Sequence, residues 1–126
     1  MKKILFSLSA LIFGLGTQAQ VSIGSGATGS VNQAIPVECN YGYTYSQMIY
    51  PAADINASGT ITSLKFYKQG TGLANSSDWT VYLGHTTNST FASTTSWEAV
   101  AGLTQVFSDS VIQVGNEVTV TFTTSF

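Results

Sequence analysis

The sequence predicts an all-β fold, specifically an antiparallel β-sandwich of the jelly-roll-like or Ig-like kind, preceded by a signal peptide. Apolar and polar residues alternate along several short runs, and Gly, Asn and Ser residues separate these runs. After residue 20 no segment has a convincing helical period. Short alternating runs joined by tight turns place one set of side chains on a buried sheet face, which favours a sandwich.

The N-terminus has the three-part layout of a secretory signal peptide. Two lysines precede an uncharged apolar run, residues 4–16, and Thr17 and Ala19 put small residues at positions −3 and −1 of a cut before Gln20. The run is too short and too interrupted by Gly for a membrane span. We therefore expect a secreted or cell-surface protein, with the periplasm as the alternative, and no transmembrane segment after the signal is removed.

Three regions follow from this reading. Residues 1–19 are the signal peptide, residues 20–40 are a Gly/Ser-rich arm with a first short strand at Val21–Ile23, and residues 41–126 are the sandwich domain. The strands that we expect in the domain are 41–50, 61–68, 79–85, 105–107, 111–114 and 117–122.

Each expected strand has its own pattern. Tyr residues alternate along 41–50 until Pro51. In 61–68 the charged Lys65 lies between Leu64 and Phe66, which places Lys65 on the outer face of the strand and its two neighbours on the inner face. Gly115-Asn116 is a tight-turn signal between the last two runs. The parity of the three clearest strands predicts a core of Leu64, Phe66, Trp79, Val81, Leu83, Val118 and Val120.

The chain stops at Phe126, just after an alternating run. We therefore expect the domain to lack its last strands. Such a domain leaves a strand edge uncovered, and an unpaired edge is a template for association with another chain.

Charge and composition exclude several classes of function. After residue 19 there are two lysines, no arginine and six acids, a formal charge of −4 that does not favour nucleic acid. Cys39 is the only cysteine, so it is either a small buried residue or half of an intermolecular disulfide. His85 is the only histidine. We find no catalytic constellation and predict that the protein is not an enzyme.

We expect no cofactor except calcium, for which two loop pairs are candidates. Asp54 with Asn56, and Asn75 with Asp78, offer the oxygen ligands that calcium prefers. The alternative is turn chemistry, because Asp and Asn also bond to their own backbone in turns.

Aromatic side chains suggest a second kind of site. A ring with an apolar body and a polar tip suits stacking against sugars, and only the parity opposite the core could present such rings. The resulting candidates are Tyr67, Tyr82 and Trp97. Sheet propensity and core packing are the alternative explanation for frequent Tyr.

The order of these segments resembles a β-sandwich module found near the start of many large surface and secreted proteins of Bacteroidota, which are often exported by type IX secretion. The resemblance runs from Val21 to Phe126, and its most specific string is Trp79-Thr80-Val81-Tyr82-Leu83-Gly84-His85-Thr86. It implies a non-catalytic, adhesin-like module and assigns no ligand residues.

Our leading hypothesis is a secreted or cell-surface β-sandwich that serves for adhesion or spacing in a larger exported protein. The alternative is a carbohydrate-binding module that targets a secreted hydrolase. The expected partner is an extracellular protein or a glycan.

Overall fold

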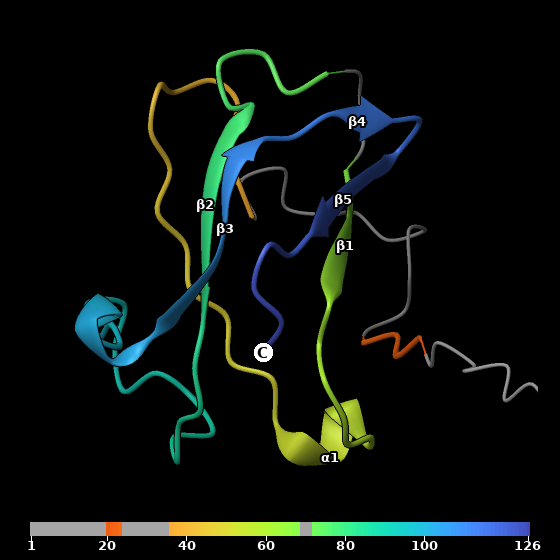
Figure 1. Ribbon diagram of the computed structural model, residues 1–126. Helices are drawn as coiled ribbons and strands as arrows, with labels where there is room; N and C mark the ends of the chain where they lie inside the picture. Colours follow the sequence, from red (N-terminus) through yellow and green to blue (C-terminus); the bar gives the residue numbers. More distant parts are fainter. Residues whose placement is uncertain (1–19, 24–35, 69–71) are drawn as a thin grey trace, which may run out of the picture.

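Five short strands carry most of the regular structure in the part of the chain that the computed structural model describes, residues 20–23, 36–68 and 72–126. The strands are β1 (Ser63–Tyr67), β2 (Asp78–Leu83), β3 (Thr104–Ser110), β4 (Gln113–Val114) and β5 (Glu117–Thr121). A one-turn helix, α1 (Ala52–Ile55), precedes β1, and a 3-10 turn, η1 (Val100–Gly102), lies between β2 and β3 (Figure 1). The prediction of an all-β chain is confirmed.

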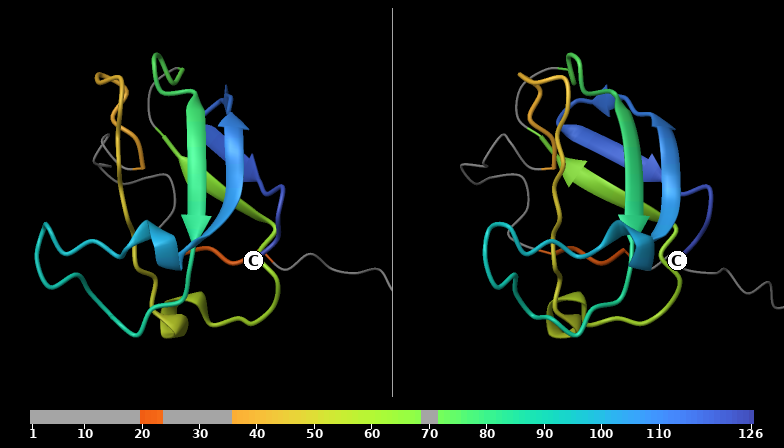
Figure 2. Two further views of the ribbon diagram at one scale, coloured as in Figure 1. Left: turned by 60° about the vertical axis from the view of Figure 1, so that its left-hand side comes forward. Right: turned by 90° about the vertical axis from the view of Figure 1, so that its left-hand side faces the viewer.

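The strands form two antiparallel sheets. One has the order β1-β5-β4 and the other pairs β2 with β3. Figure 2 shows β2 and β3 lying across β1 and β5. The predicted turn at Gly115-Asn116 joins β4 to β5, and Gly115 has a φ of 61°, a left-handed conformation that glycine adopts without steric cost.

The register of β1 against β5 confirms the predicted parity of both strands. Leu64 lies opposite Val120, and Phe66 lies opposite Val118, so their side chains share one face. Lys65 points to the other face, where its ammonium donates to the Glu117 carboxylate at 2.8 Å. This hydrogen bond, together with the charge of Glu117, raises the pKa of Lys65.

The hydrophobic core draws on both sheets. Trp79 of β2 packs edge-on against Phe66 of β1, with ring centroids 5.8 Å apart. The buried members of the core are Leu73, Trp79, Phe107, Val111, Val118 and Val120. Of the predicted core, Trp79, Val118 and Val120 are buried, whereas Leu64, Phe66, Val81 and Leu83 are half-buried.

A β-bulge in the second sheet explains why the core of β3 was missed. Val81 lies opposite Phe107 and Tyr82 lies opposite Gln105, so Val106 has no residue facing it. Two consecutive residues, Val106 and Phe107, are then both buried, which a period of two does not predict. The Val106 carbonyl accepts instead from the backbone N–H of Thr123 at 3.0 Å and from its hydroxyl at 3.1 Å.

The prediction of a strand at 41–50 is wrong. The segment pairs with neither sheet, and Tyr41, Tyr43 and Tyr45 are 68%, 97% and 54% exposed. Alternation describes side chains, whereas a strand also needs a neighbouring backbone to bond to. All three views show this segment running beside β2, on the side away from β3 (Figures 1 and 2).

The N-terminal predictions lie mostly outside the described residues. This applies to the signal peptide, residues 1–19, and to most of the Gly/Ser-rich arm. Val21–Ile23 is described and forms no strand, contrary to our expectation. Over the described ranges, the structure contains no helix long and apolar enough to cross a bilayer.

The core can be tested at Trp79. We expect Trp79→Ala to lower the free energy of unfolding by about 3–5 kcal/mol, because it leaves a large cavity between the sheets. It also removes the donor that bonds to the Ser76 carbonyl at 2.7 Å. Urea denaturation measures the loss. The control is Val114→Ala, at a residue 69% exposed on β4, where we expect a change within about 0.5 kcal/mol. Equal losses in the two variants would contradict this description of the core.

Candidate functional site

The connection between β2 and β3 is a long loop whose two ends meet. Gly84 follows β2, and Leu103 precedes β3. A Cβ on Gly84 would collide with the Leu103 side chain, so glycine permits this close approach. The residues between them, including Trp97, form a loop that leaves the second sheet at the end of β2 and returns to it at the start of β3.

Gln47 ties this loop to the segment that runs beside β2. Its Oε1 accepts from the backbone N–H of Glu98 at 2.8 Å, and its Nε2 donates to the Glu98 carbonyl at 2.8 Å. The side-chain amide thus satisfies both backbone groups of one residue, as a neighbouring strand would. The same Nε2 donates to the Tyr45 hydroxyl at 2.6 Å, which positions the Tyr45 ring.

The Glu98 side chain holds the loop from within. Its Oε1 accepts from the Thr86 hydroxyl at 2.9 Å and from the Asn88 amide at 2.7 Å. The Thr86 hydroxyl in turn accepts from the backbone N–H of Asn88 at 3.1 Å. Glu98 is therefore a structural acceptor that shapes the start of the loop.

Three aromatic rings meet beside this network. Trp97 is 50% exposed. The Tyr45 ring lies 5.0 Å from it at an interplanar angle of 58°, and the Phe91 ring lies 6.5 Å from it at 53°. Trp97 is thus a half-exposed aromatic surface that two tilted rings contact.

An open depression of about 460 Å³ lies at this cluster. It is lined by Gln47, Phe91, Ser93, Thr94, Ser96 and Trp97. The lining combines aromatic faces with hydroxyl groups and one amide, and the Ser93 and Ser96 hydroxyls are 2.8 Å apart. Such a surface can bind a ligand that has both an apolar face and a hydroxyl-bearing edge.

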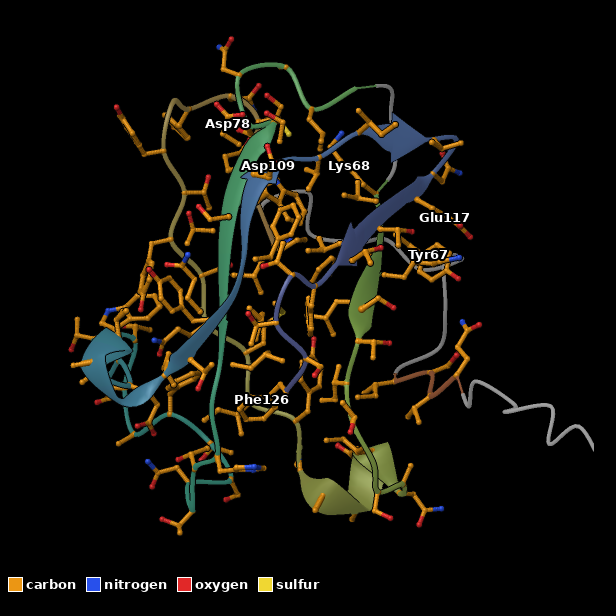
Figure 3. All side chains as sticks on the ribbon, in the orientation of Figure 1. Tyr67, Lys68, Asp78, Asp109, Glu117 and Phe126 are labelled. Carbon is orange, nitrogen blue, oxygen red and sulfur yellow. The ribbon has the colours of Figure 1, made fainter. Side chains whose placement is uncertain are left out.

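The three predicted stacking residues do not lie together. Tyr67 is on β1 and 39% exposed, Tyr82 is half-buried on β2, and Trp97 is in the loop. Figure 3 labels Tyr67 beside Glu117, on the three-stranded sheet. Of the three, Trp97 is the residue that belongs to the depression.

Sequence reasoning did not bring the partners of Trp97 together. Tyr45 is one of the alternating Tyr residues of 41–50, where we expected a strand, and Phe91 lies in the Ser/Thr-rich stretch before Trp97. Gln47 carried no signal at all, because its contact with Glu98 spans 51 residues of sequence. The signal for this site in the sequence was an aromatic residue, Phe91, within a Ser/Thr-rich loop.

The calcium candidates lie at separate places. Asp54 is exposed in α1, and Asn56 ends that helix with a φ of 45°, its backbone N–H donating to the Ala52 carbonyl. Asp78 begins β2 and accepts from the Ser110 hydroxyl at 2.5 Å. Figures 1 and 3 place α1 and Asp78 at opposite ends of the molecule. The described ranges contain no cluster of three or more His, Cys, Asp or Glu residues suited to a metal.

The single cysteine and histidine have apolar neighbours. Cys39 is half-buried and packs against the core cluster. The His85 ring lies 5.0 Å from the Phe126 ring. Neither residue lines the depression at Trp97.

No family model, curated protein or solved structure matches this chain. Its function must therefore be inferred from the residues of the depression themselves.

The role of Gln47 is testable by an isosteric change. In Gln47→Glu the carboxylate no longer donates to the Glu98 carbonyl and instead repels it, so we expect a loss of roughly 1–3 kcal/mol in the free energy of unfolding. Thermal and urea unfolding measure this loss. The same change at the exposed Gln105 of β3 is the control, with an expected effect within about 0.5 kcal/mol. If Gln47→Glu were as stable as the control, the hydrogen bonds between Gln47 and the Glu98 backbone would not hold the loop.

Proposed function

We propose that this protein is a non-catalytic, exported attachment module that binds carbohydrate through the depression at Trp97. The observation that carries the proposal is the half-exposed Trp97 ring, flanked by Tyr45 and Phe91 and bordered by hydroxyl and amide groups. This assignment joins adhesion to sugar binding, because a glycan is the surface to which the module attaches.

The chemistry of a pyranose ring supports this match. Its axial C–H groups form an apolar face, and its hydroxyl groups form a polar edge. The Trp97 face removes the apolar surface from water, which is favourable by roughly 25 cal/mol per Å². Ser93, Thr94 and Ser96 carry hydroxyl donors and acceptors for this edge, and the Gln47 Oε1, which accepts from the Glu98 N–H, keeps a second lone pair. A volume of about 460 Å³ is within the range of small-ligand sites.

The lining of the depression supports binding rather than hydrolysis. Hydrolysis of a glycosidic bond usually needs two carboxyl groups on either side of it. The residues that line the depression include no carboxylate, and the nearby Glu98 carboxylate accepts from Thr86 and Asn88. This lining favours recognition of the sugar without cleavage.

The wider context belongs to the same proposal. Residues 1–19 serve as a secretory signal, and the two crossed sheets form a β-sandwich of the jelly-roll-like or Ig-like kind. The module then acts at the cell surface or outside the cell, as the resemblance to Bacteroidota surface proteins implies. A spacer without a ligand is the second candidate, and it is favoured only by the resemblance.

Substitution of the central ring tests the binding site. We expect the wild type to be retarded by polysaccharides in affinity electrophoresis, and Trp97→Ala to bind at least about tenfold more weakly, since one large aromatic contact contributes roughly 1–3 kcal/mol. Tyr45→Ala should also weaken binding.

The matched control is Tyr67→Ala, an exposed aromatic on the other sheet, which should bind as the wild type does. A wild type that binds no glycan would favour the spacer. Equal losses in Trp97→Ala and Tyr67→Ala would place the site elsewhere.

Export has its own test. The secreted protein should begin at Gln20, because Thr17 and Ala19 meet the preference of signal peptidase for small residues. Mass spectrometry of the N-terminal peptide from culture medium and membrane fractions measures this. Retention of Met1 in exported protein would contradict the prediction.

A further inference from the structure

We propose that the Trp97 depression recognises one uncharged sugar residue, rather than a run of residues or an acidic sugar. This inference rests on the proposed function and specifies its ligand. It follows from the angles between the three rings and from the distribution of charge around them.

The ring geometry limits the site to one sugar. Centroid distances of 5.0 Å and 6.5 Å mean that Tyr45 and Phe91 contact the Trp97 ring itself. Their planes are tilted from the Trp97 plane by 58° and 53°, so the three rings do not share one flat face. Successive sugars of an extended chain, or a flat crystalline surface, would need coplanar rings. Phe91 and Trp97 line the depression, whereas Tyr45 does not, so this geometry favours the stacking of one sugar on Trp97.

The polar groups around this floor suit a neutral ligand. The lining hydroxyls of Ser93, Thr94 and Ser96 and the amide of Gln47 are all uncharged. A sugar carboxylate placed among them would lose its hydration without gaining a cation, which is costly. Neutral hydroxyl groups can exchange hydrogen bonds with this lining at little cost.

A carboxylate beside Trp97 in the sequence would repel an acidic sugar. Glu98 is adjacent to Trp97 in sequence, and its carboxylate accepts from Thr86 and Asn88. Of the cations in the described ranges, Lys65 is on β1 and pairs with Glu117, and Lys68 directly follows that strand. Figure 3 shows Lys68 near the strands of the three-stranded sheet, away from the loop and η1. Of the lysines that the structure describes, neither lies on this loop, so a carboxylate in the depression would meet the like charge of Glu98.

Matched pairs of sugars test the charge requirement. The probes are the methyl glycosides of glucose, galactose and mannose, each compared with its uronic acid, which differs only by oxidation of C6. Saturation-transfer and titration NMR suit the millimolar affinities that a single sugar permits. For whichever of these sugars binds, we expect the neutral glycoside to bind at least about tenfold more tightly than its uronic acid. We expect the saturation-transfer signal to be lost in Trp97→Ala.

A chain-length series tests the one-residue limit. Affinity per binding site should change by less than about threefold from the disaccharide to the hexasaccharide of the same sugar. Tyr43→Ala is the decisive variant, because Tyr43 is 97% exposed on the segment that carries Tyr45 and would serve as the next stacking ring. We expect Tyr43→Ala to leave hexasaccharide binding unchanged.

The outcomes separate the two proposals. An acidic sugar that binds as well as its neutral partner and is lost in Trp97→Ala would overturn this inference while supporting carbohydrate binding. An affinity that rises more than about tenfold with the length of the oligosaccharide, and that falls in Tyr43→Ala, would also overturn this inference while supporting carbohydrate binding. Failure of every sugar and polysaccharide to bind the wild type would overturn carbohydrate binding itself, and this inference with it.

Discussion

The carbonyl oxygen of Val106 joins the two sheets of this protein. The bulge in β3 deprives it of a partner across the sheet, and a buried carbonyl without a partner would cost about 1–3 kcal/mol. Thr123, just beyond β5, supplies both its backbone N–H and its hydroxyl. The last strand of one sheet is thereby held against the middle of the other, and the Phe66–Trp79 contact fills the space between them. The orientation of β2, and of the loop that leaves it, depends on this junction.

The candidate site is built outside both sheets, yet it is anchored to them. The loop that bears Trp97 departs from β2 and returns to β3, so both of its ends are fixed by strand pairing. Gln47 then fastens its far side to the segment beside β2 through two bonds to the backbone of Glu98. A ligand site assembled in this way loses little further entropy when a ligand binds, because its rings are already held.

Local patterns were sufficient to predict the strands that have regular partners. In β1 and β5 one parity faces the core throughout, and in β2 it does so up to the bulge, so alternation alone identified Leu64, Trp79, Val118 and Val120 as inward residues. The bulge at Val106 breaks that period, and no local signal marks it. For residues 41–50 the prediction of a strand is wrong for the opposite reason, because the sequence alternates strongly but no strand lies beside the segment to pair with it. For the site, the chemistry of Trp97 could be read from its residue type, whereas the Tyr45–Trp97 ring contact and the Gln47–Glu98 bonds arise only when segments about 50 residues apart come together.

The contact between Gly84 and Leu103 has a consequence for how the protein can change. Because the loop closes on itself at this point, a change in the length of the loop between its ends need not move β2 or β3, provided that the bonds between Gln47 and Glu98 are kept. Each doubling of loop length costs only about 0.6 kcal/mol in closure entropy. Residues of the loop outside these contacts can therefore change with little effect on the stability of the two sheets.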